Sequence, residues 1–127
     1  MATVTLTSAA RDAMCNALVD LIDAGTTDAN GDIVIMAAAD AEVATLAMTN
    51  PAFGNSATGV ATAAAISDDT NATGGTAIAF KVQNRDNTEV FRGDAATSGA
   101  SLNMSSTTVG AGDTVSIGAM TVTMPAS

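Results

Sequence analysis

The chain has 127 residues, 13 acidic against 4 basic side chains, a net charge of -9 at pH 7 and no histidine. This length predicts a single domain, residues 1–127. The charge excludes electrostatic capture of nucleic acid or of an anionic membrane surface, since either needs a basic patch. Without histidine, the most common general base and metal ligand, we expect no enzyme, no cofactor and no metal site.

The apolar content predicts a folded but thin core. The hydrophobic fraction is 47%, but Leu, Ile, Val and Phe contribute only 24 residues, and alanine supplies much of the rest. Trp and Tyr are absent, so an interface must be built from broad complementary surface. Cys15 is the single cysteine, so no disulfide within the chain is expected. The sequence shows neither a charged-then-apolar leader nor an uninterrupted apolar run of about 18 residues, so we expect no signal peptide and no membrane span.

The first predicted element is a helix over about residues 8–24. Ser8 or Thr7 supplies an N-cap, and Gly25 is a natural stop. Apolar residues recur at helical spacing: Ala10, Met14, Ala17, Leu18, Leu21 and Ile22, with Cys15 and Val19 widening the stripe. The opposite face carries Asp12, Asn16, Asp20 and Asp23. We expect the face of Met14, Leu18 and Leu21 to be buried, against a sheet or between subunits.

From Asp32 onward the period changes to two, and we expect a β region over about residues 32–125. Residues 33–38 are apolar on both faces, which is typical of a central strand. Residues 43–49 and 59–66 predict the next strands.

The clearest hairpin follows: residues 78–83 alternate, residues 84–87 turn the chain, and residues 88–92 return. Residues 102–104, 115–117 and 120–124 predict further strands, with a tight turn at residues 110–113. The pattern therefore predicts a mainly β fold with one N-terminal helix, an antiparallel β-sandwich or small barrel of about six to eight short strands.

One acidic segment has spacing that suits a cation. Asp28, Asn30 and Asp32 alternate as in a calcium loop, but Ile33 replaces its glycine and Ala39 its bidentate glutamate. The favoured interpretation is a solvated turn, and an adventitious cation site is the alternative.

Two further acidic groups are interpreted as polar loops. Asp68, Asp69 and Asn71 lie in a Gly- and Thr-rich stretch, and Asp40 with Glu42 could pair but has no visible electrophile nearby. We expect the segments 28–32 and 68–71 to face solvent.

The remaining candidates are the thiol, the cations and the methionines. Cys15 lies inside the predicted helix and is interpreted as a buried structural thiol. Lys81, Arg85 and Arg92 gather around the predicted hairpin, as ordinary surface charge or as a docking contact to an acidic protein surface. Five methionines, Met36, Met48, Met104, Met120 and Met124, are assigned to strands, where they fill the core or form an adaptable contact surface.

Four segments cover most of the chain: SAARDAMCNALVDLIDAG, LAMTNPAFGNSATGVATAAAI, GTAIAFKVQNRDNTEVFRGDAATSGASLNM and VGAGDTVSIGAMTVTMPAS. Taken in order, they resemble a family of small proteins from tailed-phage structural gene clusters. These segments consist of a helix, turns and strand ends, so the resemblance concerns the fold more than an activity.

The resemblance implies a head decoration or cement protein, made in the host cytoplasm and located on the virion. Such a protein binds the outer face of the capsid and bridges subunits of the major capsid protein. Copies of the chain are expected to join one another as a dimer or trimer. The alternative within the virion is a tail, adaptor or fibre-base protein. A secreted carbohydrate-binding β module is a third class, but the chain lacks aromatic stacking residues and a leader. The resemblance implies no catalytic residue.

Overall fold

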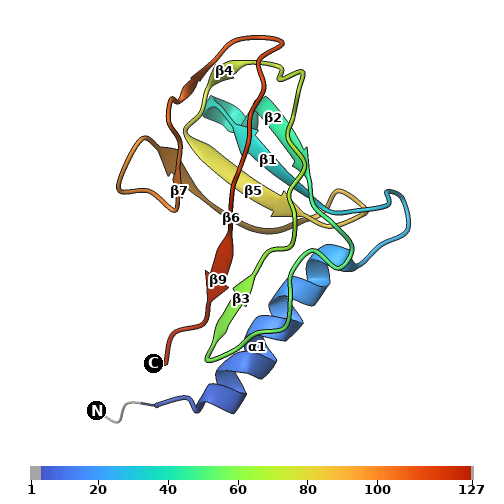
Figure 1. Cartoon of the computed structure of the whole chain (residues 1–127), viewed down its shortest axis with the longest axis vertical. Helices are drawn as coiled ribbons and strands as arrows, with labels where there is room; N and C mark the ends of the chain where they lie inside the picture. The colour runs from blue at the N-terminus through green and yellow to red at the C-terminus, as the bar shows by residue number, and fades with distance from the viewer. Residues whose placement is uncertain (1–3, 127) are drawn as a thin grey trace.

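The computed structural model describes residues 4–126, a helix followed by short strands (Figure 1). The helix α1 spans Ser8–Asp20 and continues as a 3-10 turn, Leu21–Asp23. The strands are β1 (Asp32–Met36), β2 (Glu42–Ala47), β3 (Val60–Thr62), β4 (Gly75–Thr76), β5 (Ala79–Gln83), β6 (Glu89–Ala96), β7 (Leu102–Asn103), β8 (Thr108–Val109) and β9 (Thr121–Thr123), with a second 3-10 turn at Ala38–Asp40. In this part of the chain, no helix is long and apolar enough to cross a membrane.

Five of the described strands form one curled sheet in the order β2-β1-β5-β6-β7. Its neighbours are antiparallel except β6 and β7, which run parallel, so the sheet is mixed. Two small antiparallel sheets, β3 with β9 and β4 with β8, stand beside it, and α1 runs along β3 and β9 (Figure 1). The result is roughly a half-barrel, which confirms the predicted mainly β fold with one N-terminal helix.

The central strand of the core is β1, which pairs with β2 on one side and β5 on the other. Its residues Ile33, Val34, Ile35 and Met36 are all at most 7% exposed. Successive side chains of a strand point to opposite faces, so both faces of β1 are covered. Ile33 lies across from the fully buried Val82 of β5. The prediction of a central strand that is apolar on both faces is confirmed.

Only one side of the predicted apolar stripe of the helix is buried, and it is not the expected face of Met14, Leu18 and Leu21. Cys15, Val19 and Ile22 are buried, whereas Met14 is 48% and Leu21 54% exposed. Successive residues of an α-helix are roughly 100° apart around its axis. The inward face is therefore rotated by about a quarter turn from the expected one, toward the side that carries the aspartates.

Polar contacts explain this rotation. Side chains expected to face solvent instead hold the main chain of the segment that leads into β3. The hydrogen bonds join Asp12 to Ser56 Oγ (2.8 Å) and Gly59 N–H (2.7 Å), Asn16 to Ser56 N–H (2.7 Å), and Asp23 to Ala52 N–H (2.9 Å). Main-chain N–H groups that leave water need acceptors, and α1 supplies them. The helix thus docks through one apolar face and one polar face.

The strands depart from prediction where the sequence period is weak. The strand expected over residues 59–66 is shorter in the structure, where only Val60–Thr62 form β3. The second strand of the hairpin is longer than expected and continues to Ala96. Residues 115–117 contribute only a bridge, between Val115 and Asp69. The short strands β4 and β8 were not predicted, because two residues give no measurable alternation.

Both predicted turns are present. Asn84 N–H donates to Thr88 O at 2.8 Å between β5 and β6. At residues 110–113, Asp113 N–H donates to Gly110 O at 3.0 Å, and a carboxylate oxygen of Asp113 accepts from Gly110 N–H at 2.8 Å. Turn residues with short polar side chains stabilise their own main chain in this way, and such residues therefore allow turns to be predicted from the sequence.

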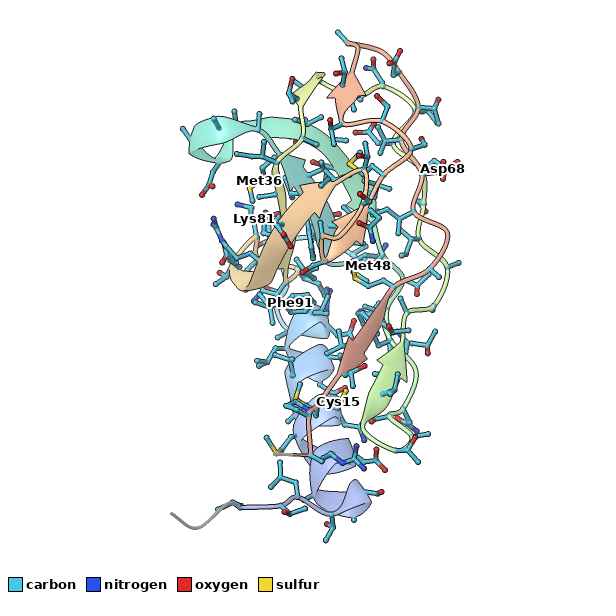
Figure 2. All side chains as sticks on the ribbon, turned by 90° about the vertical axis from the view of Figure 1, so that its left-hand side faces the viewer. Cys15, Met36, Met48, Asp68, Lys81 and Phe91 are labelled. Carbon is cyan, nitrogen blue, oxygen red and sulfur yellow. The ribbon has the colours of Figure 1, made fainter. Side chains whose placement is uncertain are left out.

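The methionines fill the core, as the first of the two interpretations had it. Met36 and Met48 are at most 2% exposed (Figure 2). Met104, Met120 and Met124 are partly buried and pack against the core cluster. Only Met36 lies within the bounds of a described strand, because the other four stand just outside strand ends.

Candidate functional site

The thiol of Cys15 is buried in the protein interior. The residue is 0% exposed, and its Sγ lies 3.5 Å from the carbonyl oxygen of Val122 on β9 (Figure 2). This confirms the interpretation of Cys15 as a buried thiol. A thiol that no substrate reaches does not serve as a nucleophile.

The two aspartates of the possible cation loop, Asp28 and Asp32, each interact with a different neighbouring side chain. Asp28 accepts a hydrogen bond from Asn87 Nδ2 at 3.0 Å. Asp32 is the first residue of β1, and partial burial raises the pKa of its carboxyl group against an opposing hydrogen bond from Gln83. The expectation that all of the segment 28–32 faces solvent is therefore wrong at Gly31, which is buried, and at Asp32, which is half-buried. Within residues 4–126, no three His, Cys, Asp or Glu side chains are placed to hold a metal ion.

Asp40 and Glu42 do not form a carboxylate pair. Asp40 points to Arg92, whose hydrogen bond lowers the pKa of the Asp40 carboxyl. Glu42 accepts hydrogen bonds from the hydroxyls of Thr45 and Thr73, and these lower its pKa. Each carboxylate thus has a structural partner of its own.

The loop over residues 68–71 is only half solvated. Asp68 is exposed, as expected (Figure 2). Asp69 turns inward: one carboxylate oxygen accepts from Thr45 N–H on β2 at 2.9 Å, and the other accepts from Asn71 N–H at 3.0 Å. The expectation that this loop faces solvent is therefore wrong at Asp69.

Aspartates that hold turns are a general feature of the described chain. Six of them accept hydrogen bonds from main-chain N–H groups: Asp12, Asp23, Asp69, Asp86, Asp94 and Asp113. Bonds from Gly59, Thr26 and Ser101 are the largest cause of the lowered pKa of Asp12, Asp86 and Asp94, respectively. Much of the acidic composition therefore serves the fold.

Two of the three candidate cations lie side by side on the sheet. Lys81 of β5 is directly across from Arg92 of β6. Arg92 makes a bidentate ion pair with Asp40, at 3.1 and 3.0 Å, and a second with Glu89, at 3.0 and 2.6 Å. These bonds lower the pKa of both carboxyl groups and raise that of Arg92, with Glu89 the larger cause. The local charge is therefore much less positive than the linear sequence indicates.

Arg85 is separate from this pair and does not project freely from the hairpin turn. Its Nε donates to Asp28 O at 2.8 Å, and Asp28 N–H donates to Arg85 O at 2.9 Å. Asp86 beside it accepts from Thr26 N–H at 2.8 Å. These bonds fasten the turn after β5 to the loop that follows α1. The three cations therefore form no single positive patch.

A surface that the sequence placed in the core lies on the outside of α1. We call Met14, Leu18 and Leu21 the outer stripe. Met14 and Leu21 are about half exposed and Leu18 is half-buried. Their spacing of four and three residues puts them on one face of the helix. The described chain thus leaves three large apolar side chains in contact with water.

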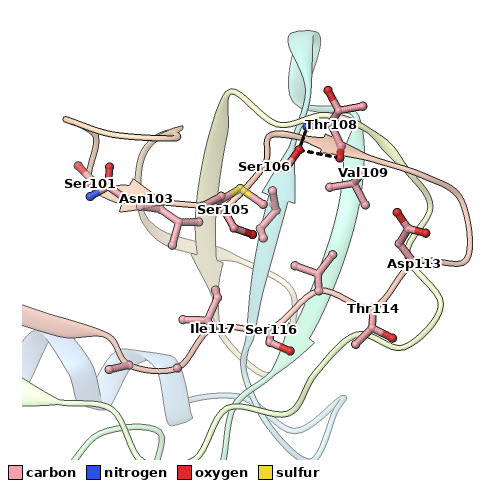
Figure 3. Close-up of a pocket in the computed structure, with 16 residues that line it drawn as sticks. Ser101, Asn103, Ser105, Ser106, Thr108, Val109, Asp113, Thr114, Ser116 and Ile117 are labelled. Carbon is pink, nitrogen blue, oxygen red and sulfur yellow. Dashed lines mark hydrogen bonds between the residues drawn. The ribbon is translucent and has the colours of Figure 1, made fainter.

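A slot opens between the free edge of the large sheet and the C-terminal segment. One wall consists of residues 91–93 and 101–106, and the other of residues 115–122. It comprises two adjoining cavities of about 670 and 360 Å³, which share Ser101, Leu102 and Ala119. Figure 3 shows the larger cavity with its hydroxyl-bearing rim. No sequence signal marks the slot, because its walls are segments that approach one another without pairing.

The lining of the slot suits hydrogen bonding to an extended chain better than covalent chemistry. The larger cavity carries hydroxyls from Ser101, Ser105, Ser106, Thr108, Thr114 and Ser116. Its carboxylate, Asp113, is already used by Gly110. Among the described lining residues of both cavities there is no thiol, and the one cation, Arg92, is ion-paired. No protein-family model, curated protein or solved structure matches the chain.

Proposed function

We propose that the chain is a decoration protein that binds the outer face of a tailed-phage capsid and bridges neighbouring major capsid protein subunits. The resemblance of its four segments to small phage structural proteins supports this partner. Two of these segments, residues 8–25 and 46–66, carry the hydrogen bonds between α1 and the segment before β3. They resemble the family in the part that determines how α1 is docked.

The observation that carries the proposal is the outer stripe of α1. An apolar row on a helix of an acidic protein is a suitable surface for docking onto another protein. Asp12 of α1 and Asp23 of the 3-10 turn after it are directed toward the segment before β3. The outer stripe therefore offers the shell an apolar contact with little charge to desolvate.

The energy of one such contact is small. Fully burying a Leu or Met side chain gives about 1.5–3 kcal/mol, and half-exposed side chains gain roughly half of that. Three side chains then contribute about 3 kcal/mol, which is less than association costs in lost freedom of motion. Lasting attachment therefore needs several linked contacts. This need supports a protein that acts as a dimer or trimer on a repeating lattice.

The test measures occupancy on capsids that lack the protein. Met14→Asp with Leu21→Asp places two charges in the outer stripe, and we expect occupancy to fall at least tenfold, for a loss of about 1.4 kcal/mol or more. The matched control, Ala9→Asp with Ala13→Asp, adds the same charge at exposed positions of α1 outside the stripe. If both variants bind like the parent, the outer stripe does not carry the attachment.

Two further measurements complete the test. Replacing Lys81, Arg85 and Arg92 with Ser asks whether the hairpin also contacts the shell, and we expect a weaker salt dependence of binding if it does. Unchanged occupancy and salt dependence would remove the hairpin from the contact. The copy number on purified particles separates the proposal from a tail or adaptor role, because decoration requires a copy number that follows the capsid lattice.

A further inference from the structure

The slot is bordered by strand edges whose main-chain groups have no strand partner among the described residues. On β6, Ala95 N–H donates to Ile78 O at 3.0 Å, and Gly93 is in register with Phe80. Bonded pairs alternate along an antiparallel ladder, so the main-chain groups of Arg92 point away from β5 and toward the slot. Strand β7 pairs with β6 only at its far end, through Ala95 and Ala96.

The opposite wall has the same property. On β9, Met124 N–H donates to Gly59 O, and Ala63 N–H donates to Met120 O. The same alternation leaves the main chain of Thr121 pointing away from β3. The slot is therefore a gap in the half-barrel, with a strand edge on either side.

The interior of the gap predicts the character of its occupant. The smaller cavity is lined by apolar side chains, among them Phe80, Phe91, Leu102, Met120 and Val122. The larger cavity has a rim of hydroxyls. A short extended segment fits both, with apolar side chains on its inward face, hydroxyls on the other, and a main chain that pairs with the edges. A charged segment does not fit, because the apolar interior offers no partner for its charge.

The chain contains such a segment. Residues 4–6, Val-Thr-Leu, alternate apolar and hydroxyl side chains, and we call them the N-terminal arm. Thr7, which follows the arm, is the N-cap of α1, and its Oγ1 accepts from Ala10 N–H at 3.1 Å. The arm belongs to no described strand, and Val4 is 74% exposed. In its own molecule the arm is not part of the slot lining: Leu6 N–H donates to Ala126 O at 2.7 Å, and the arm lies at the end of the molecule away from β4 and β7 (Figure 1). Three residues span roughly 10 Å when extended.

We propose that the N-terminal arm of one copy adds as a strand in the slot of a second copy, so that the chains are joined by strand exchange. The inference rests on the part of the proposed function in which copies join one another. Its test uses the free protein, whereas the test of attachment uses capsids, so either can fail without the other.

The experiment is disulfide trapping between two variants, each in a Cys15→Ala background. One carries Val4→Cys and the other Ala119→Cys in the wall of the slot, with a tag that distinguishes their masses. An arm seated in the slot raises the effective concentration of the thiols to the millimolar range, so at micromolar protein we expect mixed disulfides roughly a hundredfold faster than in the control. The control pairs Val4→Cys with Ala29→Cys, an exposed position outside the slot. Equal rates in the two mixtures would overturn the proposal.

Light scattering gives a second, independent measurement. We expect the parent to be larger than a monomer, and Val4→Asp with Leu6→Asp to be monomeric with the same far-ultraviolet circular dichroism. A monomeric parent, or a double variant that keeps the parent's mass, would overturn strand exchange. If the double variant loses its circular dichroism, the trapping experiment decides.

Discussion

The inward face of α1 can be tested with two neighbouring residues. Ile22 is 0% exposed and Leu21 is 54% exposed, although both belong to the apolar stripe predicted for the helix. Ile22→Ala removes three carbons, about 2.4 kcal/mol of transfer free energy at ~0.8 kcal/mol each. A residual cavity of roughly 50 Å³ adds about 1 kcal/mol. The site has little room to collapse, because a Cβ on Gly31 would lie 2.5 Å from Ile22 Cγ2.

We therefore expect Ile22→Ala to lower the free energy of unfolding by about 3–4 kcal/mol, and Leu21→Ala by less than about 1 kcal/mol. In a domain of this size the first change corresponds to a drop in Tm of roughly 10–15 °C. Urea unfolding followed by far-ultraviolet circular dichroism is the suitable assay, since the chain has no Trp or Tyr to report by fluorescence. Equal costs for the two variants, or a larger cost at Leu21, would refute the assigned orientation of α1.

Three further predictions concern single positions. Cys15 should react with thiol reagents only as fast as the protein unfolds, and rapid labelling of the native protein would contradict its burial. Gly31→Ala should cost about 1–3 kcal/mol in urea unfolding, because its Cβ would lie 2.7 Å from a carbonyl oxygen; Gly118→Ala, with nothing within 4 Å, is the control and should stay within about 0.5 kcal/mol. Burial raises the pKa of Asp32, so its ionisation opposes folding. Asp32→Asn should therefore stabilise the protein at pH 7, and this gain should shrink as the pH falls through the raised pKa and vanish below the ordinary value of 3.8; a gain that persists in acid would rule out ionisation as its cause.

Elements with a sustained period were predictable from the sequence. The central strand and the hairpin of β5 and β6 each carry five or more residues of clear pattern, and both are present. The helix was also correct in extent, but its orientation was not. Hydrophobicity alone marks Met14, Leu18 and Leu21 as the better apolar row. It does not register that Asp12 and Asn16 find main-chain donors in the segment before β3, and these bonds turn the other row inward.

The candidate site shows the same limit. The gathering of Lys81, Arg85 and Arg92 is visible in the sequence, but their partners are not. Asp40 lies 52 residues from Arg92 along the chain, and the carbonyl of Asp28 lies 57 residues from Arg85. Pairings over such separations depend on the topology of the sheet. The slot is even harder to predict from the sequence, because it arises where residues 91–106 and 115–122 approach one another without pairing.

The aspartates that hold turns determine where the molecule is weakest in acid. Because the pKa values of Asp12, Asp86 and Asp94 are lowered, these carboxylates stabilise the fold at pH values above the ordinary pKa of an aspartate. That contribution is lost as the pH falls through the lowered values. The sheet itself depends on main-chain pairing and apolar packing, which acid leaves intact. Acidification should therefore open the connections first, releasing α1 from its segment and the hairpin from its loop while the five-stranded sheet still holds together.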